Sequence, residues 1–157
     1  MKKLSFLMAI SLLFVLGCAA QRDVAPVRAD AGLAANKVAA IKTGKEEGAI
    51  DKEFFKKIVA EKATNVALVD VRTPFEYQAG HFEGAKHVFI NDLYDKGCDA
   101  TLAQFPKEEY VVFVCATGAR AGEMYFGIKD ECKNVDMKRF YFLDAEVMYT
   151  PNGPVVK

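Results

Sequence analysis

The chain has 157 residues, of which 52% are hydrophobic and 27% are charged, a composition typical of a globular protein that buries a core. Basic and acidic residues are equal in number, at 21 each. This balance provides no basic excess, so nucleic acid is not among the expected partners.

The N-terminus has the pattern of an export signal. Lys2 and Lys3 precede an apolar stretch, residues 4–16, which is too short for a comfortable membrane span and suits the hydrophobic region of a signal peptide. The sequence VLGC follows at residues 15–18. It resembles the lipobox of bacterial lipoproteins, in which cleavage precedes the cysteine and the thiol carries a diacylglycerol. An ordinary signal peptide cleaved near Ala19 or Ala20 is the alternative.

The lipoprotein resemblance implies a location. Residues 1–17 are expected to be removed, and Cys18 is expected to carry lipid that anchors an exported protein to a membrane without a spanning helix. Ala19 stands where inner-membrane lipoproteins usually have aspartate, which favours the periplasmic face of an outer membrane over that of an inner one. Residues 18–48 lack aromatic side chains and are predicted to be the lipidated cysteine and a flexible tether.

A folded domain is predicted over residues 49–157, where aromatic residues resume. Asp51 is placed to cap a helix that continues to about residue 59, and a second helix is predicted over 120–131. Short apolar runs with the character of buried strands occupy residues 66–71, 86–90, 110–114 and 139–143. Buried strands alternating with helices predict an α/β fold with a parallel sheet covered on both faces.

The sequence VVFVCATGAR, residues 111–120, places a thiol where a strand gives way to a helix. In parallel sheets, functional sites lie at the carboxyl ends of the strands. A loop of small residues before a helix can turn several N–H groups toward one anion, and Gly118 permits a positive φ there. These features favour the thiolate form of Cys115, and Arg120 adds a cation. A buried structural cysteine is the alternative.

A second motif precedes this loop. The sequence DVRTPFEYQAGHFEGA, residues 70–85, closely resembles the signature D-x-R-x-x-x-E-[FY]-x-x-G-H-[IF]-x-G-A of rhodanese-like domains, and its distance from Cys115 also fits. The resemblance covers about residues 49–157. It implies a parallel five-stranded sheet with helices on both faces, and sulfur transfer through a cysteine persulfide without a cofactor.

The resemblance assigns roles to individual residues. Cys115 matches the sulfur-carrying nucleophile. The loop that binds the persulfide matches Ala116, Thr117, Gly118, Ala119 and Arg120. Asp70, Arg72 and Glu76 match a charged cluster near the site, for which a structural role is favoured over a catalytic one. The expected donor is a small sulfur-containing anion such as thiosulfate, or a persulfide, and the expected acceptor is a thiol or cyanide.

Two details of the sequence refine this function. Related phosphatases place arginine six positions after the cysteine, whereas Arg120 is five positions after Cys115, so the smaller loop favours sulfur transfer over phosphate chemistry. The usual glycine pair after the last strand is replaced by Asp144 and Ala145, which could crowd the loop or add negative charge beside it. A catalytically weak binding or sensing module is therefore the alternative function.

The remaining cysteines and histidines carry weaker signals. No C-x-x-C pair or histidine cluster indicates a metal site. Cys98 and Cys132 could form a disulfide in an oxidising compartment, or either could pair with Cys115 in thiol redox chemistry, but two separate thiols are slightly favoured. His81 follows a glycine at a turn and is expected to hydrogen-bond locally. His87 begins a strand and has no motif support.

Overall fold

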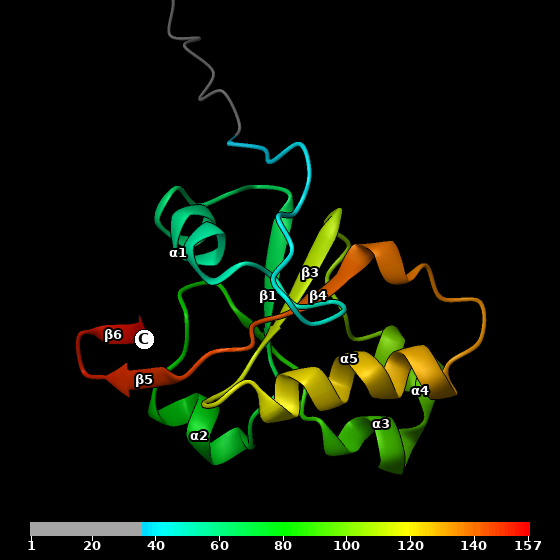
Figure 1. Ribbon diagram of the computed structural model, residues 1–157. Coiled ribbons are helices and arrows are strands. Elements are labelled where there is room, and N and C mark those ends of the chain that lie inside the picture. Colours follow the sequence, from blue (N-terminus) through cyan, green and yellow to red (C-terminus); the bar gives the residue numbers. More distant parts are fainter. Residues whose placement is uncertain (1–35) are drawn as a thin grey trace, which may run out of the picture. The chain divides into compact units, whose positions relative to one another are not determined.

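The computed structural model describes residues 36–157. The predicted signal peptide, Cys18 and the tether up to residue 35 lie outside the described residues. Figure 1 shows a central sheet with helices on either side of it. Within the described range, no helix is long and apolar enough to cross a membrane.

The central sheet is parallel and contains four strands in the order β2-β1-β3-β4. The strands are β1 Val66–Asp70, β2 Lys86–His87, β3 Tyr110–Val114 and β4 Phe140–Phe142. β1 and β3 occupy the centre and pair along their whole length, from Val66 opposite Tyr110 to Asp70 opposite Val114. Both strands therefore end at the same edge of the sheet, and Cys115 follows directly at that edge.

The predicted α/β class is confirmed, but the predicted number of strands is not. The position of a fifth strand beside β4 holds a single bridge, between Ala49 and Phe142. The preceding residues fold back on themselves through an antiparallel bridge between Thr43 and Ile50, so they cannot extend along β4. The predicted second strand also shortens to Lys86–His87.

Helices connect these strands and cover the sheet. They are α1 Lys52–Ala60, α2 Pro74–Ala79, α3 Asn91–Lys96, α4 Cys98–Leu102 and α5 Ala119–Glu131, with a 3-10 turn at Met137–Arg139. The Asp51 side chain accepts a hydrogen bond from the Phe54 N–H at 2.9 Å, which confirms the predicted cap of α1. α2 begins with a capping box, in which Thr73 and Glu76 satisfy each other's backbone N–H groups.

Alternate residues of β3 supply two cores. Val111 and Phe113 pack on the side of α3 and α5 with Leu93, Met124 and Ile128. Val112 and Val114 pack on the opposite side with residues of α1 and the C-terminal hairpin. This alternation is the period of two expected of a strand that is buried on both faces. Cys115 continues the first series and is buried with it.

A C-terminal β-hairpin forms a separate two-stranded sheet of β5 Val147–Thr150 and β6 Gly153–Val156. The sequence reading did not anticipate it. At the other end of the described chain, Asn65 holds Val38 through two side-chain hydrogen bonds of 2.9 Å, and Thr64 donates to the Asn36 carbonyl. Residues 36–48 thus contact the domain ahead of the boundary predicted at residue 49.

Cys98 and Cys132 form a disulfide, with their Cα atoms 5.5 Å apart. The prediction of two separate thiols is therefore wrong. α4 begins at Cys98, and Cys132 caps the C-terminal end of α5. The disulfide joins the start of α4 to the C-terminal end of α5 across 34 residues of sequence, and the sequence spacing alone could not reveal this contact.

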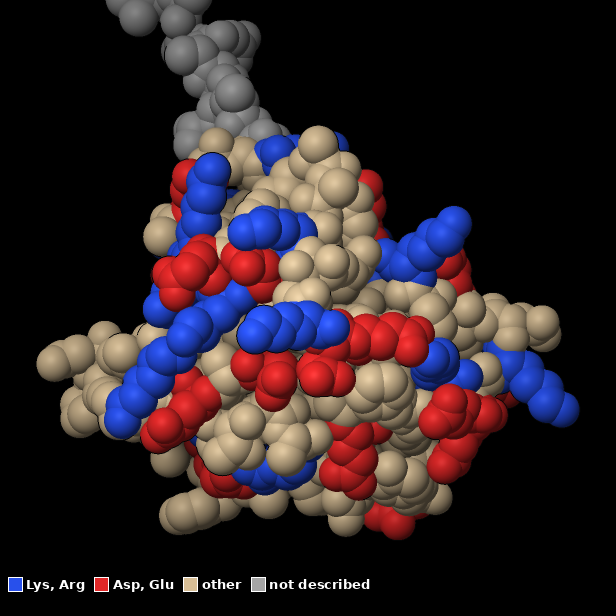
Figure 2. All heavy atoms as spheres, in the orientation of Figure 1, with Lys and Arg blue, Asp and Glu red and all other residues tan. Residues whose placement is uncertain are grey.

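Charged side chains of both signs are interspersed on the face drawn in Figure 2, with several acidic and basic side chains in contact. The ion pairs of the described residues lie mostly at the surface, as in Lys129–Glu47 at 2.7 Å and Lys62–Glu83 at 3.0 Å. Two pairs, Asp70–Arg72 and Glu76–Arg120, instead lie near Cys115.

Candidate functional site

The site is centred on the loop between β3 and α5. Cys115 is the free cysteine of the described residues, and only 1% of its surface is exposed. Gly118 has φ +88°, a conformation that glycine adopts without strain and that turns the chain into α5. The first turn of α5 therefore begins four residues after the thiol, and its positive dipole end lies at the same edge of the sheet.

Gly118 is also required by a close contact. A Cβ atom at this position would lie 2.8 Å from Asp144 Oδ1 and 3.0 Å from Asp144 Cα. The backbone N of Ala145 would be 3.2 Å away. Asp144 and Ala145, which replace the expected glycine pair, thus lie directly against the cysteine loop, and Asp144 remains exposed.

Arg120 lies in the first turn of α5 and is bound by Glu76 of α2. Its Nη1 and Nη2 atoms donate to the two Glu76 carboxylate oxygens, both at 2.7 Å. The Thr73 hydroxyl donates to the same carboxylate at 2.7 Å. The hydrogen bond from Arg120 holds the pKa of Glu76 well below its usual range. The same bond raises the pKa of Arg120, with smaller contributions from Cys115 and Asp70.

Asp70 and Arg72 form a second pair at the end of β1. Arg72 donates from Nε and Nη2 to the Asp70 carboxylate at 2.7 to 3.0 Å. Its backbone N–H donates to the same group at 3.0 Å, and Nη2 also donates to the Gly80 carbonyl at 2.6 Å. The Arg72 side chain is 4% exposed and the Asp70 side chain is 0% exposed. This pair fixes the turn that leads from β1 into α2.

The structure places one further residue, Tyr149, in this group. Its ring lies over the Arg72 guanidinium, 3.3 Å from Arg72 Cζ to the ring centroid, a cation–π geometry. Its hydroxyl donates to the Cys115 carbonyl at 3.4 Å. Burial, and then the charge of Asp70, raise the pKa of Tyr149. The sequence reading missed Tyr149, although alternating residues before a Pro-Asn-Gly turn could have predicted the hairpin that carries it.

The two histidines lie beside α2 rather than at the thiol loop. His81 Nδ1 and the Tyr77 carbonyl are 2.9 Å apart, which confirms the predicted local hydrogen bond. His87 Nε2 is 2.7 Å from the Arg72 carbonyl. The Tyr77 ring stacks on both imidazoles, with centroids 3.9 and 4.7 Å apart. These contacts give both histidines a structural role beside α2.

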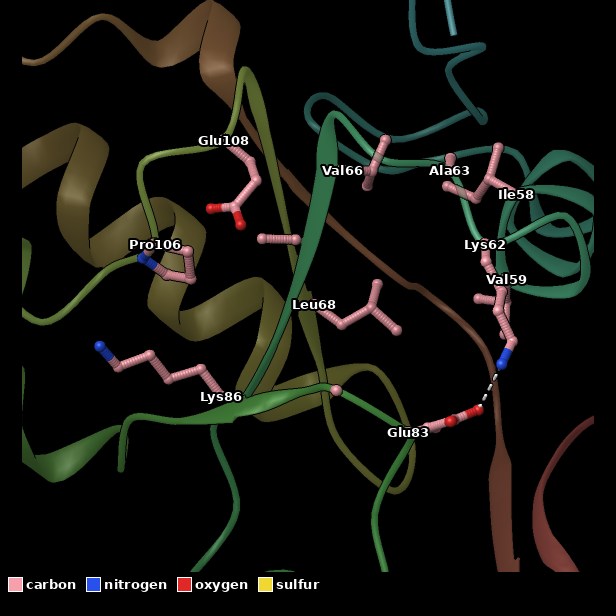
Figure 3. A pocket seen from close by; sticks show the side chains of 12 residues that line it. Ile58, Val59, Lys62, Ala63, Val66, Leu68, Glu83, Lys86, Pro106 and Glu108 are labelled. Atoms are coloured by element: carbon pink, nitrogen blue, oxygen red, sulfur yellow. Dashed lines mark ion pairs between the residues drawn. The ribbon is translucent and has the colours of Figure 1, made fainter. Parts of the chain in front are cut away.

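A large cavity of the described residues does not contain the thiol. It has a volume of about 540 Å³ and lies beside residues 66–68 of β1, which the short strand β2 does not pair, between α1 and residues 83–86. Figure 3 shows Leu68 and Val66 facing it, with the Lys62–Glu83 ion pair on its rim. A smaller hollow of about 350 Å³ lies on the outer side of the loop. Its lining includes Gly118, Ala119, Phe126, Phe142 and Asp144.

The predicted site residues thus fall into three groups. The loop residues 115–120 run from the end of β3 into α5. Asp70 and Arg72 lie at the end of the neighbouring strand, and Glu76 of α2 is bonded to Arg120 of the loop. Among residues 36–157, no group of three or more His, Cys, Asp or Glu side chains could hold a metal ion.

Comparison with known proteins identifies the class of this fold and site. The model of the rhodanese-like domain family matches residues 52–145, which include both motifs and most of the described chain. The chain therefore belongs to the rhodanese-like domain family. No curated protein matches the sequence.

Several solved structures are similar to the chain. An uncharacterized protein from Saccharomyces cerevisiae is 25% identical, with a TM-score of 0.47, over 66% of this chain and 85% of that one. A rhodanese-related protein from Thermoplasma volcanium is 17% identical, with a TM-score of 0.43, over 62% and 82% of the two chains. A rhodanese-like domain protein from Staphylococcus aureus is 24% identical, with a TM-score of 0.43, over 60% and 80%.

Proposed function

We propose that the chain is a sulfurtransferase that carries sulfane sulfur as a persulfide on Cys115. The observation that carries this proposal is the free thiol between the carboxyl end of β3 and the first turn of α5, inside the segment that matches the family. A helix N-terminus and a loop of small residues stabilise negative charge, and the nucleophile of this reaction is negative before and after each step.

The reaction balances without a cofactor. The Cys115 thiolate attacks the outer sulfur of thiosulfate, the sulfur–sulfur bond of the donor breaks, and sulfite leaves with the bonding electron pair. An acceptor thiolate or cyanide then attacks the outer sulfur of the persulfide, and the Cys115 thiolate is released. Cys115 contributes to raising the pKa of Arg120, so the guanidinium lies close enough to the sulfur to stabilise the anionic intermediate.

Mass spectrometry of the intact protein tests this proposal. After incubation with thiosulfate, and separately with a low-molecular-weight persulfide, the protein should gain the mass of one sulfur atom, and cyanide should remove it. Cys115→Ala should gain nothing. Cys132→Ser together with Cys98→Ser serves as the control, because it removes the disulfide and should keep the sulfur adduct. Absence of any adduct with both donors would reject sulfur transfer.

A binding or sensing module is the second candidate, and a specific observation favours it. Cys115 is 1% exposed, Arg120 is already bound by Glu76, and Asp144 lies against Gly118. A donor must therefore displace existing contacts before it reaches the sulfur. This candidate predicts that the wild-type chain takes up no sulfur. It also predicts that the Arg120→Gln variant captures a different amount of partner from the wild-type chain.

We also propose that Cys18 carries lipid and anchors the chain to the periplasmic face of a membrane, with the outer membrane favoured. The VLGC sequence at residues 15–18 supports this proposal. In cells, the wild-type chain should sediment with membranes, and Cys18→Ser should appear in the soluble periplasmic fraction. Cys115→Ser is the matched control and should remain with the membranes. Equal distribution of all three chains would contradict lipidation.

A further inference from the structure

The first strand of the C-terminal hairpin, β5, contacts the cysteine loop at two consecutive peptide groups. The Tyr149 hydroxyl donates to the Cys115 carbonyl at 3.4 Å. The Val147 N–H donates to the Ala116 carbonyl at 2.8 Å. Both donors lie beyond residue 145, where the match to the family ends. The loop that carries the thiol is therefore held by a segment that the family match does not include.

These two contacts determine the direction of the loop N–H groups. In a trans peptide the C=O and the following N–H lie in one plane and point in opposite directions. Because the carbonyls of Cys115 and Ala116 point toward β5, the N–H groups of Ala116 and Thr117 point away from it. Consecutive N–H groups that share one side of the chain form the kind of nest that binds an anion.

Tyr149 is itself held in place by the buried ion pair. Its ring lies 3.3 Å over the Arg72 guanidinium and meets the Phe82 ring edge-on at 6.1 Å. Arg72 is in turn fixed by Asp70 and by the Gly80 carbonyl. Burial raises the pKa of Tyr149, so its hydroxyl keeps its proton and remains a donor across the pH range in which a thiol titrates.

We propose that Tyr149 is a positioning residue, whose hydroxyl holds the Cys115 carbonyl and thereby turns the loop N–H groups toward the side on which the Cys115 thiolate is stabilised. The inference deepens the proposed sulfur transfer and rests on it for its biological role. This role requires no contact of Tyr149 with the donor or the acceptor. Tyr149 acts through the loop backbone, and its effect is on how readily Cys115 ionises.

Other charged groups lie near the cysteine loop or Tyr149 and remain in the variants that test this role. Arg120 lies on α5 near Cys115 and is hydrogen-bonded to Glu76 of α2. Asp70 and Arg72 approach from the end of β1, beneath the Tyr149 ring. Removal of the Tyr149 hydroxyl leaves each of these charges and the ring over Arg72 in place, so a change in thiol ionisation reports the hydroxyl.

The test is the pH profile of Cys115 alkylation in the full chain. Iodoacetamide reacts with the thiolate, and mass spectrometry of the Cys115 peptide separates its labelling from that of any other cysteine. Tyr149→Phe should raise the midpoint of the profile by about half a pH unit. Tyr149→Leu, which also removes the ring over Arg72, should raise the midpoint at least as far. Thermal unfolding shows whether each variant is folded, and Tyr149→Phe carries the test if Tyr149→Leu is not.

Tyr110→Phe is the matched control. The Tyr110 hydroxyl also donates to a carbonyl at 3.4 Å, that of Ala39, but Tyr110 lies at the opposite end of β3. Its midpoint should equal that of the wild-type chain. If Tyr149→Phe gives the same midpoint as Tyr110→Phe, the positioning role is wrong. Alkylation requires no sulfur donor, so it tests positioning separately from sulfur transfer. A shifted midpoint in a chain that accepts no sulfur would support positioning and reject sulfur transfer. Sulfur uptake with an unshifted midpoint would support sulfur transfer and reject positioning.

Discussion

Two carboxylate–arginine pairs lie near Cys115, and they differ in burial and in the sequence separation of their partners. Asp70 and Arg72 are two residues apart, and their side chains are almost completely buried. Glu76 and Arg120 are 44 residues apart, join α2 to α5, and have side chains that are about one third exposed. The same pair of functional groups therefore occupies two different environments within one site.

The difference in burial predicts different roles. When a buried pair is broken, the remaining charge stays in a medium that solvates it poorly, and the cost is large. When a partly exposed pair separates, water solvates both partners, and the cost is small. Asp70–Arg72 thus fixes the turn after β1, whereas Arg120 can leave Glu76 for an anion on the cysteine loop at little cost.

Substitution of Arg72 should give the largest effect. Arg72→Met retains much of the side-chain volume but leaves Asp70 buried without its cation, and it also removes the donor to the Gly80 carbonyl. We expect a loss of about 3–5 kcal/mol in the free energy of unfolding. Urea unfolding followed by far-UV circular dichroism measures this change.

Arg139→Met is the matched control for this substitution. Arg139 also donates to backbone carbonyls and lies near an aromatic ring, but it is not paired with a buried carboxylate. We expect Arg139→Met to lose about 1 kcal/mol or less. Equal losses in the two variants would show that the buried pair has no special importance for stability.

The sequence predicted the centre of this site better than its surroundings. The strand 110–114, the loop after it and the following helix have local signatures, since an apolar run, a glycine in the turn and a helical period are all visible in consecutive residues. The Asp70–Arg72 pair is also local. These features required no knowledge of which distant segments meet.

Contacts between distant segments were predicted less well. The Glu76–Arg120 bond, the Cys98–Cys132 disulfide and the Tyr149 contact each join residues 34 or more positions apart. Each depends on how helices and the hairpin pack on the sheet. The single Ala49–Phe142 bridge in place of a fifth strand likewise depends on a turn that folds residues 43–50 back.

Substitution of Glu76 should give a smaller effect that depends on pH. The bond from Arg120 lowers the pKa of Glu76 from its ordinary value of 4.5. A carboxyl whose pKa is lower in the folded state stabilises the fold above its unfolded pKa, and this contribution is lost as the pH falls from 4.5 toward the lowered value. Glu76→Gln should therefore cost about 1 kcal/mol at neutral pH, since the pair is partly exposed, and much less at low pH.

Glu53→Gln is the matched control, because Glu53 also lies in the first turn of a helix and pairs with Lys56 at 3.0 Å. Thermal unfolding from neutral to acid pH compares the three chains. The difference between wild type and Glu76→Gln should shrink as the pH falls below 4.5, whereas Glu53→Gln should follow the wild type throughout. A constant difference for Glu76→Gln would contradict a stabilising role of the bond to Arg120, and the contrast between the two pairs would then rest on Asp70–Arg72 alone.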